Sequence, residues 1–211
     1  MARGTDTNGS AKGRFFDQQA GNWDESRGAE EDKIGALLDD LGLGRGWLVL
    51  EPGCGTGIIS RHILRRIGPE GGLLGLDISR DMLTAAADKK LSPRAIFCRA
   101  DAAAVPLRSA LADAVVCFRV FPHLADRQAA MAEFNRVLKR HGRLDIVHPA
   151  GSERINALHE RAGGAVANDR IPPEAEMRRL FADFGFEIEL LDDREERYLL
   201  RAVKRKSLVP E

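Results

Sequence analysis

Short apolar runs alternate along this chain with longer segments in which apolar residues recur at helical spacing. The runs predict seven strands, near residues 47–51, 73–77, 94–99, 113–119, 143–148, 186–192 and 197–204. Strands that alternate with helices favour a doubly wound parallel sheet. The last two runs are separated by a short turn, which favours an antiparallel pair. We therefore predict an α/β fold whose seven-stranded sheet is mostly parallel, with one antiparallel strand near the edge.

Three segments between the strands carry an apolar stripe, which is typical of helices that cover a sheet. The stripes are Ile34, Leu37, Leu38 and Leu41 in a helix at 27–41, Ile59, Ile63 and Ile67 in the next, and Ala130, Phe134, Val137 and Leu138 at 126–139. We expect Ser79 to cap the helix after the second strand. Asp145 interrupts the fifth strand, where an exposed strand start is favoured over a paired buried acid. The basic run from Arg201 to Lys206 is typical of a solvated chain end.

The remaining segments set the domain organisation. Residues 1–13 are rich in Gly, Ser, Thr and Asn, which predicts a disordered tail. Residues 14–206 then form a single domain. Within it, 14–24 carries three large aromatic residues and predicts a short helix and turn that cap a ligand site. Residues 149–172 are interpreted as an insertion on the side of that site where a second ligand enters.

A glycine-rich turn follows the first strand and carries the chemistry. Gly53, Gly55 and Gly57 lie between the strand and the next helix, Glu51 directly precedes the turn, and Asp77 ends the second strand. Glycine tolerates positive φ and lets a ligand approach the backbone closely. The helix that follows presents unpaired N–H groups, which favour an anionic group. Strand, glycine turn, helix, strand and terminal acid predict a nucleotide-binding βαβ unit.

The details of the turn indicate which nucleotide it binds. A dinucleotide site uses the pattern G-x-G-x-x-G, but the position of the last glycine is occupied by Ile58. Glu51 would repel a pyrophosphate, whereas it can accept hydrogen bonds from an ammonium group. A ligand with a sugar, an amine and a carboxylate suits this turn better than one with two phosphates. S-adenosylmethionine (SAM) is such a ligand.

Five motifs occur in one order along the chain. They are Val49-Leu50-Glu51-Pro52-Gly53-Cys54-Gly55-Thr56-Gly57, Leu76-Asp77-Ile78-Ser79 with Met82, Arg99-Ala100-Asp101-Ala102, Asp113-Ala114-Val115-Val116-Cys117-Phe118, and the segment Glu133 to Leu144. With these motifs, residues 14–205 resemble the class I SAM-dependent methyltransferases, particularly the small-molecule branch related to quinone-biosynthesis methyltransferases. The resemblance implies a Rossmann-like fold. His141 departs from it, because relatives usually carry a second glycine there.

The resemblance also implies a role for each cofactor-side residue. Gly53, Gly55 and Gly57 would let the methionine part of SAM pass, although an ordinary tight turn explains them too. Glu51 would bind the amino group, or be a solvated strand end. Asp77 would accept both ribose hydroxyls. The other roles fall to Asp101 and Ala102 at the adenine amino group, Ile78 and Met82 on the adenine faces, and Phe118 at the methyl-donor cavity. A turn aspartate and plain core packing are the respective alternatives.

Methyl transfer from a sulfonium needs a base only if the acceptor carries a proton that must leave. Among the five histidines, His148 ends the fifth strand and His123 follows the fourth, so both are candidates for a base or an orienting donor. The alternative is that they pack the rim of the site. His62 and His141 are predicted to lie on the surface. His159 could join His123 and His148 at a metal ion, but the spacing matches no ligand pattern, and we expect no metal.

Composition narrows the class of protein. The chain has 211 residues, of which 44% are hydrophobic, and its 32 basic and 32 acidic residues give a net charge of zero. This balance argues against binding to nucleic acid or to an anionic membrane. No apolar run is long enough to span a membrane, and the three cysteines share no CxxC spacing. We expect a cytoplasmic protein, monomeric or homodimeric, with a small-molecule acceptor as its partner.

The favoured interpretation is therefore a SAM-dependent methyltransferase that acts on a small molecule and releases S-adenosylhomocysteine. Two alternatives remain open. An NAD-dependent oxidoreductase is disfavoured by Ile58 and Glu51, and a SAM-binding protein without methyl transfer is compatible with every motif. The acceptor itself cannot be identified from the residues at 14–26 and 149–172.

Overall fold

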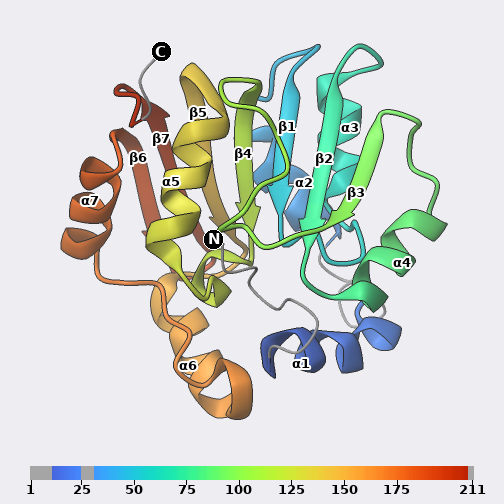
Figure 1. Cartoon of the computed structure of the whole chain (residues 1–211). Helices are drawn as coiled ribbons and strands as arrows, with labels where there is room; N and C mark the ends of the chain where they lie inside the picture. Colours follow the sequence, from blue (N-terminus) through green and yellow to red (C-terminus); the bar gives the residue numbers. More distant parts are fainter. Residues whose placement is uncertain (1–10, 25–30, 209–211) are drawn as a thin grey trace, which may run out of the picture.

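A computed structural model describes residues 11–24 and 31–208 of the chain. Its centre is one seven-stranded sheet in the order β3-β2-β1-β4-β5-β7-β6 (Figure 1). Strand β7 runs antiparallel to both of its neighbours, and the other pairs are parallel. The predicted fold class is confirmed. The strands are β1 Leu48–Pro52, β2 Gly72–Asp77, β3 Ala95–Arg99, β4 Ala112–Phe118, β5 Leu138–His148, β6 Phe186–Arg194 and β7 Arg197–Lys204.

Helices lie on both faces of the sheet and at one of its ends. Helices α2 and α3 cover one face, and α5 and α7 cover the other, while α1 and α6 lie beyond the carboxyl ends of the parallel strands (Figure 1). The α-helices are α1 Ala11–Gln19, α2 Glu31–Asp39, α3 Ser60–Ile67, α4 Arg80–Asp88, α5 Arg127–Val137, α6 Ser152–Ala162 and α7 Glu174–Asp183. Short 3-10 turns are η1 Ala20–Asn22, η3 Phe121–His123 and η4 Gly164–Val166.

Two hydrophobic clusters hold the layers together. Strand β4 contributes to both because side chains alternate along a strand: Val115 and Cys117 face α5 and α7, and Ala114 and Val116 face α2 and α3. The predicted helical stripes are confirmed, since nearly all of their residues are buried in these clusters. Ser79 is also confirmed as the N-cap of α4, where its hydroxyl accepts the N–H of Met82 at 3.1 Å.

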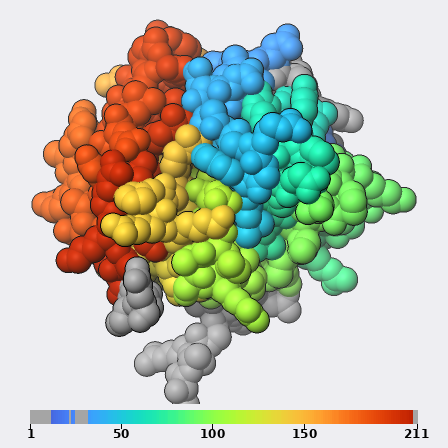
Figure 2. All heavy atoms as spheres, turned by 90° about the horizontal axis from the view of Figure 1, so that it is seen from above, coloured from blue at the N-terminus to red at the C-terminus, as the bar shows by residue number. Residues whose placement is uncertain are grey.

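The two ends of the sheet differ. Figure 2 views the end opposite α1 and α6, where the chain near residues 45, 110 and 140 forms one continuous surface. Backbone hydrogen bonds join these turns to the helices behind them, for example from Ala110 to Arg136 at 2.9 Å. A ligand site therefore belongs at the other end, where the parallel strands finish.

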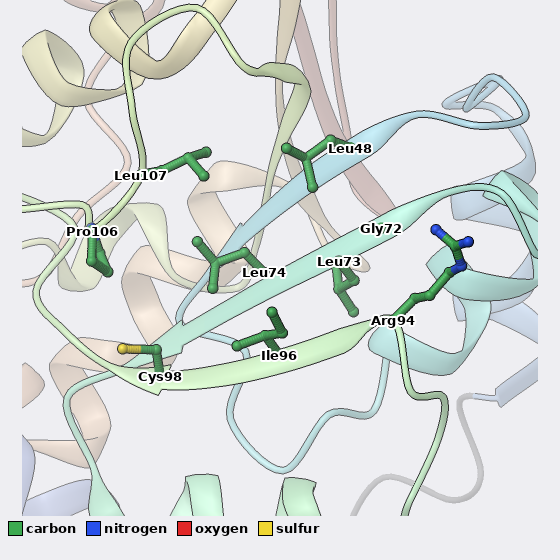
Figure 3. A pocket seen from close by; sticks show the side chains of 9 residues that line it. All are labelled: Leu48, Gly72, Leu73, Leu74, Arg94, Ile96, Cys98, Pro106 and Leu107. Carbon is green, nitrogen blue, oxygen red and sulfur yellow. The ribbon is translucent and has the colours of Figure 1, made fainter.

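One part of the sheet face is left open. An apolar groove of about 420 Å³ runs across β1, β2 and the edge strand β3 (Figure 3). Leu74 and Ile96 line it, and Ile96 is 64% exposed. The groove is formed by the face of the sheet, and neither Glu51 nor Asp77 lines it. No helix in the described part of the chain is both long and apolar enough to span a bilayer.

Several sequence predictions need correction. Helix α1 begins at Ala11, so residues 11–13 are helical and not part of a tail; residues 1–10 lie outside the described residues, as do 25–30 at the start of the helix expected at 27–41. The helix predicted to end at residue 139 ends at Val137, and β5 begins at Leu138 because that residue pairs with Ala112. His141 is exposed and adopts φ 63°, as a residue in the place of glycine must.

Buried polar residues account for the other corrections. His62 was expected at the surface, but it is 3% exposed because it lies on the inner side of α3. Asp145 is buried and accepts a hydrogen bond from Arg201 at 2.8 Å, so the exposed strand start was wrong. Lys204 was assigned to a solvated end, yet it is 5% exposed and donates to two backbone carbonyls.

Candidate active site

The glycine turn connects β1 to α3 at the carboxyl end of the sheet. Gly53, Gly55 and Gly57 have φ values of 64°, 54° and 77°, a region that side chains disfavour. A Cβ on Gly53 would lie 2.3 Å from Cγ2 of Val120, so the segment after β4 packs directly on the turn. That segment is itself strained, because Arg119 adopts φ 57°. All three glycines suit the turn, and Gly53 is also needed for this close approach.

Asp77 links the turn to the end of β2. One carboxylate oxygen accepts the N–H of Gly55 and the other accepts the N–H of Ser79, each at 2.8 Å. Burial raises the pKa of Asp77, although these backbone hydrogen bonds oppose the rise. Each oxygen retains lone-pair capacity for a further donor. Asp77 is thus fixed in place, and its carboxylate can still receive two hydroxyl groups.

Glu51 is the second buried acid of the site. It is 2% exposed and accepts a hydrogen bond on Oε2 from the hydroxyl of Ser60 at 2.7 Å. Burial raises the pKa of Glu51 to about 8, the hydrogen bond from Ser60 opposes the rise, and the charge of Asp77 adds to it. A buried carboxyl with this environment is stabilised as a carboxylate when a cation binds beside it. The solvated strand end is excluded, and the acid fits an ammonium group.

The next two motifs meet beside these acids. Ala100 donates its N–H to the carbonyl of Asp77 at 3.2 Å, which brings the end of β3 against the end of β2. Asp101 accepts the N–H of Ala103 on Oδ1 at 2.9 Å, so one of its oxygens has the turn role. Met82 is buried and would lie 3.9 Å from a Cβ on Gly55. Ile78 is half-buried, and Ala102 is buried near the same end of the sheet.

Phe118 lies on a different side from these residues. Its half-buried ring packs against the cluster formed with α2 and α3, and the guanidinium of Arg119 lies 5.3 Å from the ring centroid. The same cluster includes Ile58 and Ile59, which follow the glycine turn. Its place at the methyl-donor cavity stays a prediction.

The segment from α1 to Asp24 covers this end of the sheet and is held by two acids. Asp17 accepts a hydrogen bond from the hydroxyl of Ser79 at 2.5 Å. Asp24 accepts one from the hydroxyl of Thr56, also at 2.5 Å, and pairs with Lys89 at 2.6 Å. Sequence reasoning predicted a cap here from its aromatic residues but missed both acids, because polar residues on a short helix give no signal that distinguishes a contact from a solvated face.

A cluster of polar side chains joins α1 of the cap to the segment after β4 and to the residues around α6. Nδ1 of His123 lies 2.6 Å from Oδ2 of Asp169, and Nζ of Lys12 lies 2.6 Å from Oδ1 of the same carboxylate. Nδ1 of His159 lies 2.7 Å from the backbone oxygen of Asp169, and the two imidazole rings are 4.6 Å apart. Burial alone would raise the pKa of Asp169, but hydrogen bonds from His123 and Lys12 outweigh it and hold the pKa below the usual value.

Known proteins share this fold and part of this sequence. The family model "Methyltransferase domain" matches residues 50–146, which contain the glycine turn and both acids. A SAM-dependent methyltransferase of Aquifex aeolicus superposes with a TM-score of 0.74 at 19% identity, over 89% of this chain and 98% of the other. The fold, the acids and the family model agree. Together they support a class I SAM-dependent methyltransferase, and the family model itself covers just under half of the chain.

The chain is also similar to a curated protein and to a second solved structure. It is 32% identical over 145 residues to the ubiquinone/menaquinone biosynthesis C-methyltransferase UbiE of Syntrophotalea carbinolica, covering 63% of this chain and 61% of that protein. It also resembles a structure of the complex between the Haloferax volcanii Trm112 methyltransferase activator and the putative methyltransferase. The TM-score is 0.73 at 21% identity, over 90% of this chain and 98% of the other. The chain spans only 33% of a Streptomyces fradiae transposon protein that it also matches.

The two histidines predicted to be catalytic lie in different surroundings. His123 is in the polar cluster, whereas His148 is 3% exposed beside Tyr198, with 6.3 Å between the ring centroids. Burial, together with the nearby His123 and Arg119, lowers the pKa of His148 to about 3. Its Nε2 has no hydrogen-bond partner among residues 11–24 and 31–208. No group of three or more His, Cys, Asp or Glu side chains in these ranges is arranged to hold a metal ion.

Proposed function

We propose that this protein transfers the methyl group of SAM to a small-molecule acceptor and releases S-adenosylhomocysteine. The observation that carries the proposal is the pair of buried acids, Glu51 and Asp77, on either side of a glycine turn whose φ values are all positive. Two buried carboxyl groups at one end of a sheet are costly to keep ionised, so they indicate a ligand that offers a cation and several hydroxyl donors. An adenosyl amino acid offers both.

In this arrangement each residue meets one part of the methyl donor. Glu51 accepts hydrogen bonds from the ammonium group, and Asp77 accepts both ribose hydroxyls through the capacity left on its oxygens. The methionine part passes over Gly53, Gly55 and Gly57. The remaining contacts are assigned to Asp101 and the backbone of Ala102 at the adenine amino group, Ile78 and Met82 on the adenine faces, and Phe118 toward the methyl group.

The chemistry asks for orientation more than for a strong acid. The bound sulfonium supplies an electrophilic methyl carbon, and in-line attack disperses its positive charge. Holding the nucleophile about 3–3.5 Å from that carbon contributes several kcal/mol through orientation alone. Phe16 and Trp23 of the cap lie next to each other, with ring centroids 6.1 Å apart, and they exclude water from the side that α1 covers.

The two catalytic candidates receive different tasks. His148 has a pKa of about 3 and is neutral at physiological pH, which makes it a weak base but a suitable hydrogen-bonding partner for an acceptor. His123 is supported by a carboxylate and is the stronger candidate for the base. If His148 were the base, His148→Ala would cut turnover by about 100-fold or more, whereas an orienting role predicts a smaller loss with a raised KM for the acceptor.

The first experiment measures ligand binding by calorimetry. Wild-type protein should bind S-adenosylhomocysteine and SAM but not NADH, and Asp77→Asn should weaken the binding of both adenosyl ligands. Because the amide loses one backbone hydrogen bond, the variant should unfold at a lower temperature, and binding is measured below that transition. A matched control is Asp113→Asn, because Asp113 accepts hydrogen bonds from Leu48 and Lys139 at the opposite end of the sheet. Binding of NADH with no response to the adenosyl ligands would refute the proposal and restore the oxidoreductase.

The second experiment measures release of S-adenosylhomocysteine over a panel of thiols, phenols, quinols and amines. Turnover with any member supports methyl transfer. Binding of the adenosyl ligands with no release across the whole panel would favour the alternative of a SAM-binding protein without methyl transfer. These two results separate cofactor recognition from catalysis.

A further inference from the structure

The polar cluster formed by Lys12, His123, His159 and Asp169 joins three distant parts of the chain. Lys12 comes from α1, His123 follows β4, His159 is on α6, and Asp169 follows η4. Sequence reasoning considered the histidines but not Asp169. The carboxylate of Asp169 is 10% exposed and uses one oxygen for Lys12 and the other for His123. Both oxygens of one nearly buried carboxylate are thus engaged by the cap and by the candidate base.

This geometry fixes the tautomer of His123. An ionised carboxylate only accepts hydrogen bonds, so Nδ1 of His123 must carry the proton in the 2.6 Å contact with Oδ2. In a neutral imidazole the other nitrogen, Nε2, then holds a lone pair. Nε2 makes no hydrogen bond within the described part of the chain. The rings of His123 and Phe16 lie edge to face, with their centroids 5.4 Å apart. The lone pair is therefore available beside an aromatic surface.

His159 is the natural comparison because it has the same tautomer. Its Nδ1 faces a backbone carbonyl, which also only accepts. A neutral carbonyl stabilises an imidazolium less than a carboxylate does, and burial lowers the pKa of His159. Of the two imidazoles, His123 is the one whose protonated form has an anionic partner. The other charged or titratable side chains around it are Lys12, Arg119, Arg127, His148 and His159.

We propose that Asp169 is a positioning residue that holds His123 as the general base for an acceptor with a phenolic hydroxyl group. The inference rests on the proposed function and names its acceptor class. The hydroxyl fits because it carries a proton that must leave, and the phenyl ring fits because Phe16 offers an aromatic surface beside the base, with Trp23 packed on Phe16. Acceptors that are already anionic have no need of this arrangement.

The step balances without a further reactant. The O–H bond of the phenol breaks and its proton goes to Nε2 of His123. The oxygen forms a bond to the methyl carbon, and the carbon–sulfur bond breaks with its electron pair remaining on sulfur as a thioether. Asp169 stabilises the imidazolium through its hydrogen bond at Nδ1, and the proton then leaves to water.

The contact between Lys12 and Asp169 predicts the direction in which two variants shift the acid limb of the pH–rate profile. Lys12 shares the carboxylate with His123, so it withdraws part of the negative charge that stabilises the imidazolium. Removing Asp169 and removing Lys12 should therefore move the acid limb of the pH–rate profile in opposite directions. Asp169→Asn should move it to lower pH, and Lys12→Met should move it to higher pH. A role limited to holding the fold would not produce opposite shifts.

The experiment follows S-adenosylhomocysteine release with phenol acceptors from pH 5 to pH 9. Asp169→Asn should lower kcat about 100-fold with little change in KM for SAM, because general base catalysis contributes about 10²–10⁴-fold. The loss should nearly vanish with 4-nitrophenol at pH 8, which is already ionised. Lys89→Met is the matched control for Lys12→Met, since it removes an ion pair of the same cap with Asp24, and its acid limb should stay in place.

A readout that needs no ligand completes the test. Nitrogen-15 NMR of the free protein should show His123 as the single Nδ1–H tautomer, and Asp169→Asn should lose that preference. The inference is overturned if the acid limb does not move in either variant, if the ionised phenol fails to rescue Asp169→Asn, or if the protein methylates thiols or amines and not phenols. In the last case the proposed function stands; if the adenosyl ligands do not bind at all, both fall.

Discussion

The protein should release a proton when it binds the methyl donor or its demethylated product. Replacing Glu51 by glutamine should abolish this release. The buried carboxyl has its pKa raised from 4.5 to about 8, which makes ionisation cost about 5 kcal/mol more than in water. About nine-tenths of the molecules therefore carry a protonated Glu51 at pH 7. A ligand ammonium prefers the carboxylate, so binding must expel this proton.

The sign and size of the effect follow from that pKa. Below pH 8, every fall in pH makes the proton harder to remove, so affinity decreases. The α-amino group of the ligand stays mostly charged below its own pKa of about 7.7–8.0. Binding should thus be about five- to tenfold tighter at pH 7.5 than at pH 6.5, with close to one proton released at the lower pH. Above pH 8 the affinity should fall again because the ligand loses its charge.

The assay is calorimetry with S-adenosylhomocysteine in two buffers that differ in ionisation enthalpy, which yields the number of protons released. Glu51→Gln keeps the size of the side chain and a partner for Ser60, so it should bind about 10–100-fold more weakly at pH 8 and release no proton. Asp101→Asn is the control and should release the proton as wild type does. If wild type releases no proton at pH 6.5, or the glutamine variant releases as much, Glu51 does not hold the amino group.

Three other predictions test the site and its support. Asp77→Asn should weaken S-adenosylhomocysteine binding about 100-fold in calorimetry, because an amide replaces one of the two accepting oxygens. Gly53→Ala should lower Tm more than Gly55→Ala, since both have positive φ but only the first puts a Cβ 2.3 Å from a valine methyl; equal shifts would contradict the close approach. Arg201→Leu should lower the free energy of unfolding in urea by about 3 kcal/mol, because it leaves Asp145 buried without its hydrogen-bonded cation. A loss below about 1 kcal/mol would mean that the second arginine beside Asp145, Arg143, suffices.

The donor side of the site was predictable because its signals are local. The glycine turn, the acid before it and the acid at the end of the next strand lie within 27 residues, from Glu51 to Asp77. Parallel strands carry such terminal residues to the same edge of the sheet, so sequence order alone brings them together. The cap of α4 at Ser79 was predictable for the same reason, because an N-cap interaction spans three residues.

The wrong or missing predictions concern residues whose contacts no local sequence pattern indicates. Asp145 was expected at the surface because its partner, Arg201, is 56 residues further along and belongs to an antiparallel neighbour whose register the sequence does not reveal. His62 was misplaced because its helix has an apolar face wide enough to bury a neighbouring position. Asp169 gave no signal, since an acid in an irregular segment usually meets water. Each of these residues is defined by a contact that no local pattern encodes.

This difference between local and distant contacts also limits what the match to the family model can say about the site. The matched segment, 50–146, contains the glycine turn, Glu51, Asp77 and His123, but it ends before Asp169 and begins after Lys12. Asp169, whose carboxylate orients His123, is 46 residues away from it, and Lys12, which shares the carboxylate, is 111 residues from His123 and 157 from Asp169. The comparison therefore covers the proposed donor side of the site, while Lys12 and Asp169 lie outside the matched segment. For this reason the acceptor class has to be inferred from the Lys12–Asp169–His123 contacts of this chain and not from the activities of its relatives.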